Sequence, residues 1–313
     1  MKKEELWFDS RDGKTKLHAL RYAPDEGVVR GVVQIVHGMS EYVERYEEFA
    51  EFLTSRGFVV TGDDHLGHGK SVPEGGNFGY FCEQDPATVV VRDVHRLKKM
   101  TQELYPQVPY VIVGHSMGSF ILRNYLCKYA TGISGAVIMG TGMPSKALLL
   151  ASKATAAVIR LFCGDRHVSG FINRACFGSY NKRVENPVSE NAWLSANRSN
   201  VERYDEDPMC GFVFTVNGFR TLFELIDRLH KKENLAQIPA DLPILMISGA
   251  EDPVGDYGAG VQAAYDSLTE AGLKNVEKKL YEGDRHELLN EDDRETVMQD
   301  ICDWIDRKVM SQT

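Results

Sequence analysis

The stretch Tyr110–Gly118, YVIVGHSMG, decides the fold. Its first four residues form the kind of short apolar run that becomes a strand buried on both faces of a parallel sheet. The next five have the form G-x-S-x-G, and a helix is predicted over 120–129. A serine between a buried strand and a helix lies on a sharp turn that exposes its hydroxyl at the carboxyl end of the sheet. The segment therefore predicts a nucleophile elbow, with Ser116 as nucleophile and Gly114, His115 and Gly118 as its frame.

Strands and helices alternate on both sides of this elbow. Strands are predicted at 5–9, 16–22, 31–36, 58–61, 110–113, 136–139, 243–247 and 276–281. Helices are predicted at 46–53, 90–104, 120–129 and 261–268, and a last helix is predicted to be capped by Asn290 with Asp293 three residues later. An Asp12-Gly13 turn joins the first two strands as a hairpin. This alternation predicts an α/β fold with a mostly parallel sheet and helices on both faces.

The alternation stops between about Thr141 and Asp241. We therefore expect a core formed by residues 1–142 and 242–313, interrupted by a mainly helical insertion at 143–241. Its first helix, Lys146–Cys163, is apolar nearly all round except for a stripe of Lys146, Lys153 and Arg160. Two interpretations stay open. The helix is either buried within the insertion, or it is a lid helix whose apolar face contacts a lipid-like substrate or an interface.

A serine hydroxyl is a poor nucleophile unless a base takes its proton. Among the nine histidines, His286 follows the last predicted strand, and Asp252 follows the strand before it. The chain order Ser116, Asp252, His286 is the order typical of a catalytic triad in this architecture. Two other acids are nearby: Glu251 points elsewhere if Asp252 points in, and Asp284 is predicted to be a solvated loop residue.

An oxyanion needs main-chain donors beside the nucleophile. The N–H of Met117 lies at a predicted helix N-terminus, and that of Met39 lies in the loop His37-Gly38-Met39-Ser40-Glu41 after strand 31–36. The later loop Asp64–Ser71 contains His65 and His68 at a metal-like spacing, but further ligands are not obvious. We interpret that loop as packing beside the site, and we predict no metal.

Composition excludes several classes of protein. The 313 residues carry 36 Lys+Arg and 45 Asp+Glu, a net charge of −9, with no basic run longer than Lys2-Lys3. This argues against binding nucleic acid or an anionic bilayer. No stretch of apolar residues is long enough to span a membrane, and the N-terminal residues lack a signal-peptide pattern. The six cysteines show no C-x-x-C pair, which favours reduced thiols and a cytoplasmic location.

Five motifs together resemble the monoacylglycerol lipase and lysophospholipase group of α/β-hydrolases, which is often merged with serine aminopeptidases. They are HGMSEYVERYEEFAEFL (37–53), DDHLGHGKS (63–71), GHSMG (114–118), GAEDPVG (249–255) and YEGDRHELLNE (281–291). The resemblance implies an α/β-hydrolase fold with a mostly parallel, eight-stranded sheet, an inserted cap and no cofactor. It also implies the triad Ser116, Asp252 and His286, with oxyanion donors at Met39 and Met117. Within the cap the resemblance is thin.

The leading hypothesis is a carboxylic ester hydrolase that acts on a single-chain lipid, a monoacylglycerol or lysophospholipid, with at most weak interfacial contact through the cap. An aminopeptidase would need cap carboxylates to hold an ammonium group, and four are available: Glu202, Asp205, Glu206 and Asp207. A small-ester esterase, an acyltransferase or a perhydrolase would use the same acyl-enzyme. A non-catalytic binder on the same fold is the alternative from another class.

Overall fold

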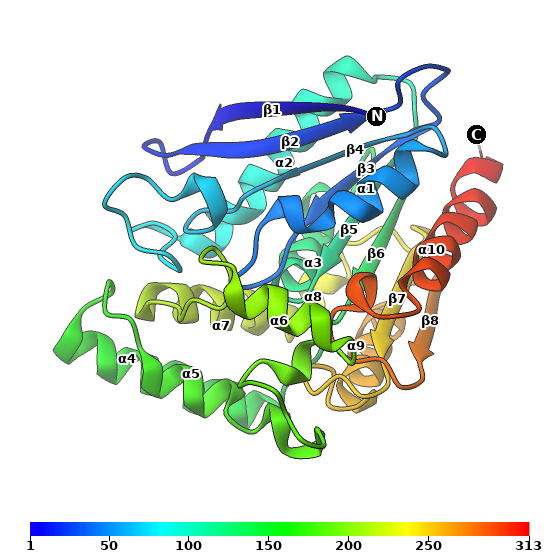
Figure 1. The fold of residues 1–313 in the computed structure, drawn as a ribbon. Helices are drawn as coiled ribbons and strands as arrows, with labels where there is room; N and C mark the ends of the chain where they lie inside the picture. The colour runs from blue at the N-terminus through cyan, green and yellow to red at the C-terminus, as the bar shows by residue number, and fades with distance from the viewer. Residues whose placement is uncertain (313) are drawn as a thin grey trace.

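The computed structural model describes residues 1–312 and contains one sheet in the order β1-β2-β4-β3-β5-β6-β7-β8. β2 pairs antiparallel with β1 and β4, and all the other neighbours are parallel. The predicted mostly parallel sheet of an α/β-hydrolase is thus confirmed (Figure 1). The strands are β1 (Lys2–Asp9), β2 (Lys16–Ala23), β3 (Gly31–Val36), β4 (Phe58–Asp63), β5 (Tyr110–His115), β6 (Gly135–Met139), β7 (Ile244–Gly249) and β8 (Val276–Tyr281).

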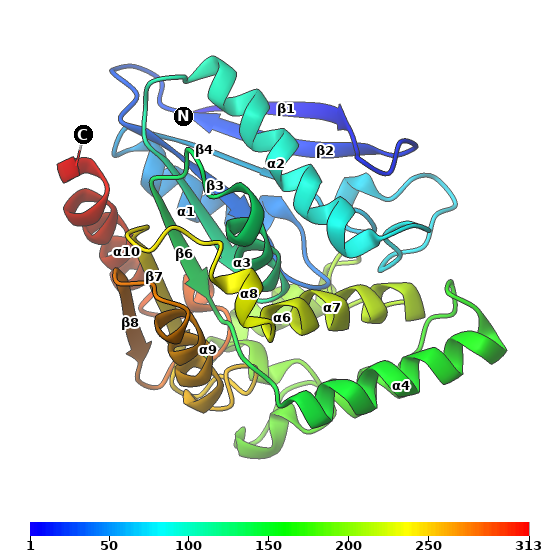
Figure 2. The ribbon, with the colours of Figure 1, turned by 180° about the vertical axis from the view of Figure 1, so that it is seen from behind.

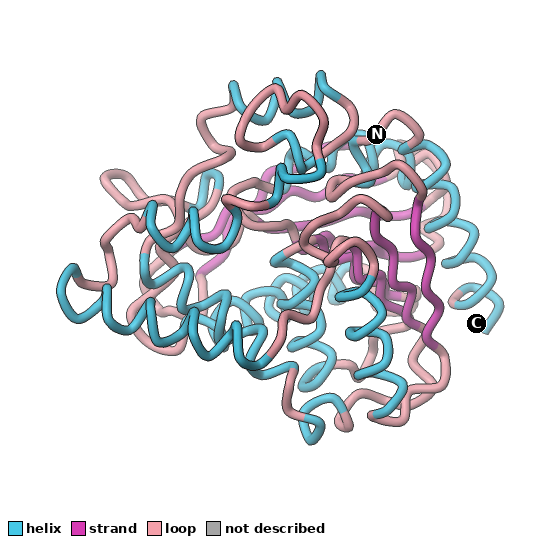
Figure 3. The backbone as a smooth tube through the Cα atoms, turned by 90° about the horizontal axis from the view of Figure 1, so that it is seen from below, coloured by secondary structure: helices cyan, strands magenta, loops and turns pink. Residues whose placement is uncertain are grey.

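Helices cover both faces of this sheet, as Figures 1 and 2 show from opposite sides and Figure 3 from below. α1 (Glu47–Thr54) and α10 (Arg294–Lys308) belong to the apolar cluster on one face. α2 (Pro86–Leu104), α3 (Met117–Tyr129) and α9 (Ala259–Glu270) belong to the cluster on the other. Every residue of β3 to β7 is buried, because apolar runs of this kind are stable only when both faces are covered.

The inserted segment between β6 and β7 lies beyond the carboxyl ends of the strands (Figure 1). Its helices are α4 (Lys146–Cys163), α5 (Gly170–Phe177), α6 (Arg198–Glu206), α7 (Val216–Leu229) and α8 (Lys232–Leu235). Short 3-10 turns occur at Val43–Tyr46, Gly69–Ser71, Tyr180–Arg183, Ala192–Leu194, Leu288–Asn290 and Met310–Gln312. Across residues 1–312, none of the helices combines the length and apolar character that crossing a bilayer requires.

α4 has the predicted bounds, but of the two open interpretations the helix buried within the insertion was wrong. Leu161 and Phe162 are 79% and 80% exposed. α4 packs on α7, which in turn packs on α2 and α3. Lys153, from the cationic stripe, donates to Glu224 and Asp227 of α7 at 3.2 and 2.9 Å. Lys153 therefore joins the outer helix to the inner one, whereas Arg160 of the same stripe pairs with Asp165 in the following loop.

The predicted start of the last helix was also wrong. Asn290 ends a 3-10 turn, and α10 begins at Arg294, after Asp293, whose side chain makes no capping hydrogen bond. The reason is tertiary. The Glu291 carboxylate accepts main-chain N–H groups from Ala196 at 2.9 and 3.0 Å and from Arg285 at 2.9 Å, so distant contacts shape this segment.

Candidate active site

The register of two central strands brings the two predicted loops together. β3 and β5 are parallel neighbours, with Val36 opposite Gly114, so Gly38 and Ser116 each lie two residues beyond that pair. The chain leaves β3 toward β4 and leaves β5 toward β6, in opposite directions. Such a switch point opens a crevice at the carboxyl edge of the sheet. A Cβ atom added to Gly38 would lie 3.1 Å from the Cβ of Ser116.

Ser116 occupies a backbone conformation that L-residues rarely adopt, with φ 53° and ψ −120°. This turn is feasible because α3 approaches both β5 and β3 very closely at two glycines. A Cβ on Gly114 would lie 2.5 Å from the carbonyl oxygen of Gly118, and a Cβ on Gly118 would lie 1.9 Å from that of Val36. The sequence therefore needs glycine at both positions to present Ser116, which is partly exposed, at the edge of the sheet.

His286 and Asp252 are hydrogen-bonded, with 2.9 Å between Nδ1 and Oδ2, and both side chains are buried. Asp252 also accepts from the Ser248 hydroxyl at 3.1 Å and from the Val254 N–H at 2.8 Å. A carboxylate can only accept hydrogen bonds, so His286 donates a proton from Nδ1 to Asp252. Its Nε2 is then unprotonated and can act as a base. The ring of His286 is flanked by Trp193, at 5.2 Å between centroids.

Ser116 and His286 line one cavity of about 1420 Å³. Within residues 1–312 their side chains are not hydrogen-bonded to each other. Met39 and Met117 line the same cavity, and in the described part of the chain their main-chain N–H groups donate to no other protein group. The structure thus gathers the five side chains and donors that the sequence singled out at one edge of the sheet.

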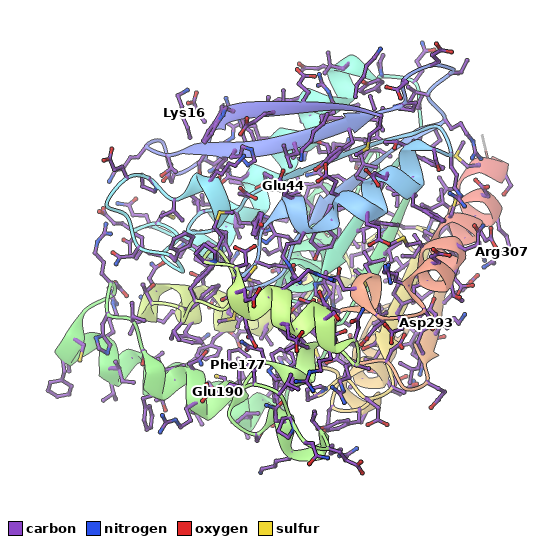
Figure 4. The ribbon with its side chains drawn as sticks, viewed as in Figure 1. Lys16, Glu44, Phe177, Glu190, Asp293 and Arg307 are labelled. Atoms are coloured by element: carbon purple, nitrogen blue, oxygen red, sulfur yellow. The ribbon has the colours of Figure 1, made fainter. Side chains whose placement is uncertain are left out.

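The cavity extends from this edge into the inserted segment. Phe177 and Glu190, which Figure 4 labels, are among its lining residues. Apolar side chains dominate much of the wall, namely Leu148, Leu149, Phe171, Ile172, Phe212, Leu222, Phe223 and Ile226. Polar side chains also line it, namely Asn173, Arg174, Asn181, Glu190 and Asn191. A site of this size and character fits a ligand with a long apolar portion and a small polar one.

Sequence reasoning missed a cluster of buried charges beside Ser116. Arg45 donates to Glu41 at 2.9 Å and to both oxygens of Glu287 at 2.7 and 2.8 Å. His115 lies between two acceptors, Glu41 Oε1 and the carbonyl oxygen of His286, each at 3.1 Å, and therefore carries a proton on both ring nitrogens. The only sequence signal was the i, i+4 spacing of Glu41 and Arg45.

The pKa values of this cluster agree with its charges. Burial alone would raise the pKa of Glu41, but the hydrogen bond and charge of His115, with the charge of Arg45, bring it below its ordinary value. Burial would lower the pKa of His115, but the hydrogen bond and charge of Glu41 raise it. His115 and Arg45 therefore lie against the carboxylates of Glu41 and Glu287 inside the protein.

The prediction of a solvated Asp284 was wrong. This side chain is 7% exposed, and its Oδ2 has no hydrogen-bond partner in the described residues. Burial, together with the negative charges of Glu291 and Asp293, raises the pKa of Asp284 to about 7. Glu251 is exposed, as expected for a residue beside an inward-facing Asp252.

The histidines of the Asp64–Ser71 loop pack as rings. His65 stacks on His37 with 4.0 Å between centroids, and His68 lies against Phe81, Phe212 and Phe214. Among residues 1–312, no three His, Cys, Asp or Glu side chains are grouped as a metal ion would require. The loop is further held by Asp64, whose carboxylate accepts from His18, from Val43 N–H and from Lys70 N–H.

The acidic residues proposed for binding an ammonium group lie elsewhere. Glu202, Asp205, Glu206 and Asp207 do not line the cavity. Three of them already have protein partners: Glu202 accepts from Arg198, Asp205 from Asn191, and Asp207 from the Tyr42 hydroxyl.

Comparisons with known proteins agree with this geometry. Residues 27–293 match the family described as serine aminopeptidase, S33. The crystal structure of a highly thermostable carboxyl esterase from Bacillus coagulans, in complex with glycerol, is 32% identical with a TM-score of 0.91, and the match covers 99% of both chains. Monoglyceride lipase of Rattus norvegicus is 26% identical over 92% of this chain and 86% of its own. Monoacylglycerol lipase of Mycolicibacterium smegmatis is 28% identical over 88% of each chain.

Proposed function

This chain belongs to the serine aminopeptidase S33 family, and from that premise we propose that it cleaves single-chain lipid esters, monoacylglycerols or lysophospholipids, with Ser116 as nucleophile. Its lipase and esterase relatives identify it as a carboxylic ester hydrolase. The observation that carries the proposal is that His286, hydrogen-bonded to the buried Asp252, lines the same cavity as Ser116.

The proposed mechanism follows from these groups. His286 Nε2 takes the proton of the Ser116 hydroxyl as its oxygen attacks the ester carbonyl carbon, while Asp252 holds the imidazole and stabilises its charged form. The N–H groups of Met39 and Met117 donate to the oxyanion. The carbon–oxygen ester bond then breaks, and the alcohol leaves with the proton from His286. Water hydrolyses the acyl-enzyme in the same way, which releases the fatty acid and restores the serine.

The substrate class rests on the shape and lining of the cavity. At about 1420 Å³ it is larger than the 300–1000 Å³ of most small-molecule sites, and the inserted segment supplies its apolar wall. An acyl chain gains free energy from such a wall in proportion to the apolar area it buries. Asn173 also lines the cavity, and its side chain, which has no protein partner among the described residues, offers hydrogen bonds suited to a polyol or a phosphate ester head group.

We also propose that residues 143–241 act as a cap on a core formed by 1–142 and 242–313, because this segment, helices and connecting loops together, supplies most of the cavity wall. α4 carries an outward apolar surface, defined by Leu150, Val158, Leu161 and Phe162, which are 57% to 80% exposed. We propose that this outer face makes weak contact with substrate aggregates. All six cysteines are free thiols, which supports a reducing, cytoplasmic location.

The decisive experiment compares Ser116→Ala with Ser267→Ala, a matched variant that removes a hydroxyl from α9, where it bonds only to the carbonyl of Ala264. We expect Ser116→Ala to fold but to lose at least about 10³-fold in kcat on a monoacylglycerol, and to resist labelling by a fluorophosphonate. Ser267→Ala should retain both properties. Appreciable esterase activity in folded Ser116→Ala would contradict the proposal.

Substrate preference needs a second comparison. Turnover of a monoacylglycerol series of increasing chain length should be measured against a proline arylamide. We expect long acyl chains to be preferred and the arylamide to be cleaved poorly, because the acidic residues of α6 lie outside the cavity. Preference for the arylamide would identify an aminopeptidase, and preference for short chains a small-ester esterase.

A further inference from the structure

The peptide group between Gly38 and Met39 is held in one orientation from its carbonyl side. No cis peptide occurs in the described chain, so the Gly38 carbonyl and the Met39 N–H point in opposite directions. The Gly38 oxygen is 2.8 Å from His37 Nδ1. An imidazole that holds this carbonyl from one side directs the Met39 N–H to the other.

The protonation state of His37 is set by its second nitrogen. Nε2 accepts the His65 N–H at 3.0 Å, so the single ring proton must lie on Nδ1, where it is donated to Gly38. Burial and the nearby charge of His65 lower the pKa of His37 to about 4, which keeps the ring neutral near pH 7. The ring is fully buried and stacked on His65, so it has little freedom to turn.

The amide side of Gly38 is held by Glu41. Oε1 accepts the Gly38 N–H at 2.6 Å, the Tyr46 hydroxyl at 2.8 Å and the His115 Nδ1–H at 3.1 Å. The other oxygen accepts from Arg45 at 2.9 Å. With four donors on a carboxylate that is 3% exposed, Glu41 has no obvious capacity left for a substrate ammonium group or for proton transfer.

We propose that His37 and Glu41 are positioning residues that clamp Gly38 from both sides and keep the Met39 N–H directed toward the oxyanion formed at Ser116. This inference rests on the proposed function, because it concerns the oxyanion of that reaction. Both clamps are side chain to main chain, so the loop does not depend on bound substrate to take its shape. A preorganised donor of this kind costs no reorganisation when charge develops.

The test uses two pairs of variants that separate the hydrogen bond from the rest of the side chain. In His37→Asn the amide NH₂ replaces the Nδ1 donor, whereas His37→Ala removes it. In Glu41→Gln the amide oxygen replaces the acceptor for Gly38, whereas Glu41→Ala removes it. Glu44→Gln is the matched control, since Glu44 lies in the same turn but pairs at the surface with Lys3.

For each variant whose folding is confirmed by its melting transition, kcat and KM on a p-nitrophenyl ester are measured with the inhibition constant of an alkyl boronic acid. The boronate mimics the tetrahedral oxyanion. We expect each alanine variant to lose about 100-fold in kcat with KM changed less than threefold, and to bind the boronate more weakly by a similar factor. The asparagine and glutamine variants should recover to within about tenfold of wild type.

Three results would overturn the inference. The first is a folded alanine variant whose kcat is unchanged. The second is a variant in which KM rises and kcat does not fall. The third is a variant whose kcat falls although it binds the boronate as tightly as wild type. If an alanine variant does not fold, the asparagine and glutamine variants still decide, because a loss beyond tenfold in kcat would contradict the clamp. The proposed function fails separately: in that case the wild-type protein itself would not hydrolyse the ester, or Ser116→Ala would remain active.

Discussion

Arg45 and Glu287 form a buried, two-pronged ion pair, with N···O distances of 2.7 and 2.8 Å, that ties the turn after the Gly38 loop to the residue following His286. The pair extends into the inserted segment, since Asn200 of α6 donates to Glu287 at 2.6 Å and Arg45 lies over the Tyr204 ring at 4.9 Å. Three parts of the proposed site therefore share one set of buried charges.

Arg45→Met should destabilise the protein by about 3–5 kcal/mol, because it leaves the Glu287 carboxylate buried without its cation and removes one of the partners of Glu41. Denaturant unfolding at neutral pH measures this loss. Arg198→Met is the control, because its pair with Glu202 is exposed and its loss should cost less than about 1 kcal/mol. Equal losses in the two variants would contradict the buried role of Arg45.

Gly118→Ala should cost roughly 3 kcal/mol or more, because the new Cβ would lie 1.9 Å from the carbonyl oxygen of Val36 and neither backbone has room to move. Gly170→Ala, at the start of α5, has open space around the new Cβ and should be close to neutral. Unfolding midpoints of the two variants make the comparison. A stable, fully active Gly118→Ala would show that β3 and α3 do not approach as described.

Asp284→Asn should change how stability depends on pH. The folded-state pKa of Asp284 is raised to about 7, whereas the unfolded chain releases this proton near the ordinary value of about 3.9. The folded state therefore binds more protons between these values, so this group lowers stability as pH rises from about 4 to 7. Asn cannot ionise, and the melting temperature of the variant relative to wild type should be higher at pH 8 than at pH 4.5.

Glu282→Gln supplies the control for that measurement, because Glu282 is exposed in the same loop. Its melting temperature relative to wild type should be nearly the same at both pH values. A pH-dependent difference of the same size in Glu282→Gln would assign the effect to the charge of the loop as a whole rather than to the buried Asp284.

Replacing Leu161 and Phe162 with serine should lower turnover of a long-chain monoacylglycerol above its solubility limit several-fold, and leave turnover of a soluble short-chain p-nitrophenyl ester unchanged. These side chains face outward from α4, where apolar contact with an aggregate would be lost. Val28→Ser is the control, because Val28 is 88% exposed in the loop before β3. If both variants turn over the aggregated substrate equally well, the outer face of α4 does not contact substrate aggregates.

The positions of the strands could be predicted from the sequence, because a short apolar run bounded by turn residues is a local pattern. Gly31–Val36 and Val276–Tyr281 were predicted with their observed bounds, and the strand–turn–helix around Ser116 was evident from apolar residues and two glycines. The placement of His286 and Asp252 at the carboxyl edge of the sheet was predicted by the same means, because a residue that follows a parallel strand lies at a known edge.

The remainder depends on partners far away in the chain. Arg45 and Glu287 are 242 residues apart, and no local pattern connects them. The apolar character of Lys146–Cys163 did not reveal which face meets α7 and which meets solvent. Asp284 looks like an ordinary loop acid until Glu291 and Asp293 are placed beside it.

The two attachments of the inserted segment have an evolutionary consequence. α6 and the turn before it are bonded to the His286 loop through Asn200 and through Arg285, which donates to the carbonyls of Ala192 and Ser195, whereas α4 rests on α7. Mutations in α4 and α5 are therefore expected to change the apolar lining of the cavity without breaking the hydrogen bonds that Asn200 and Arg285 make. We therefore expect that exchanging α4 and α5 between relatives changes substrate selectivity and leaves the hydrogen bond between His286 and Asp252 intact.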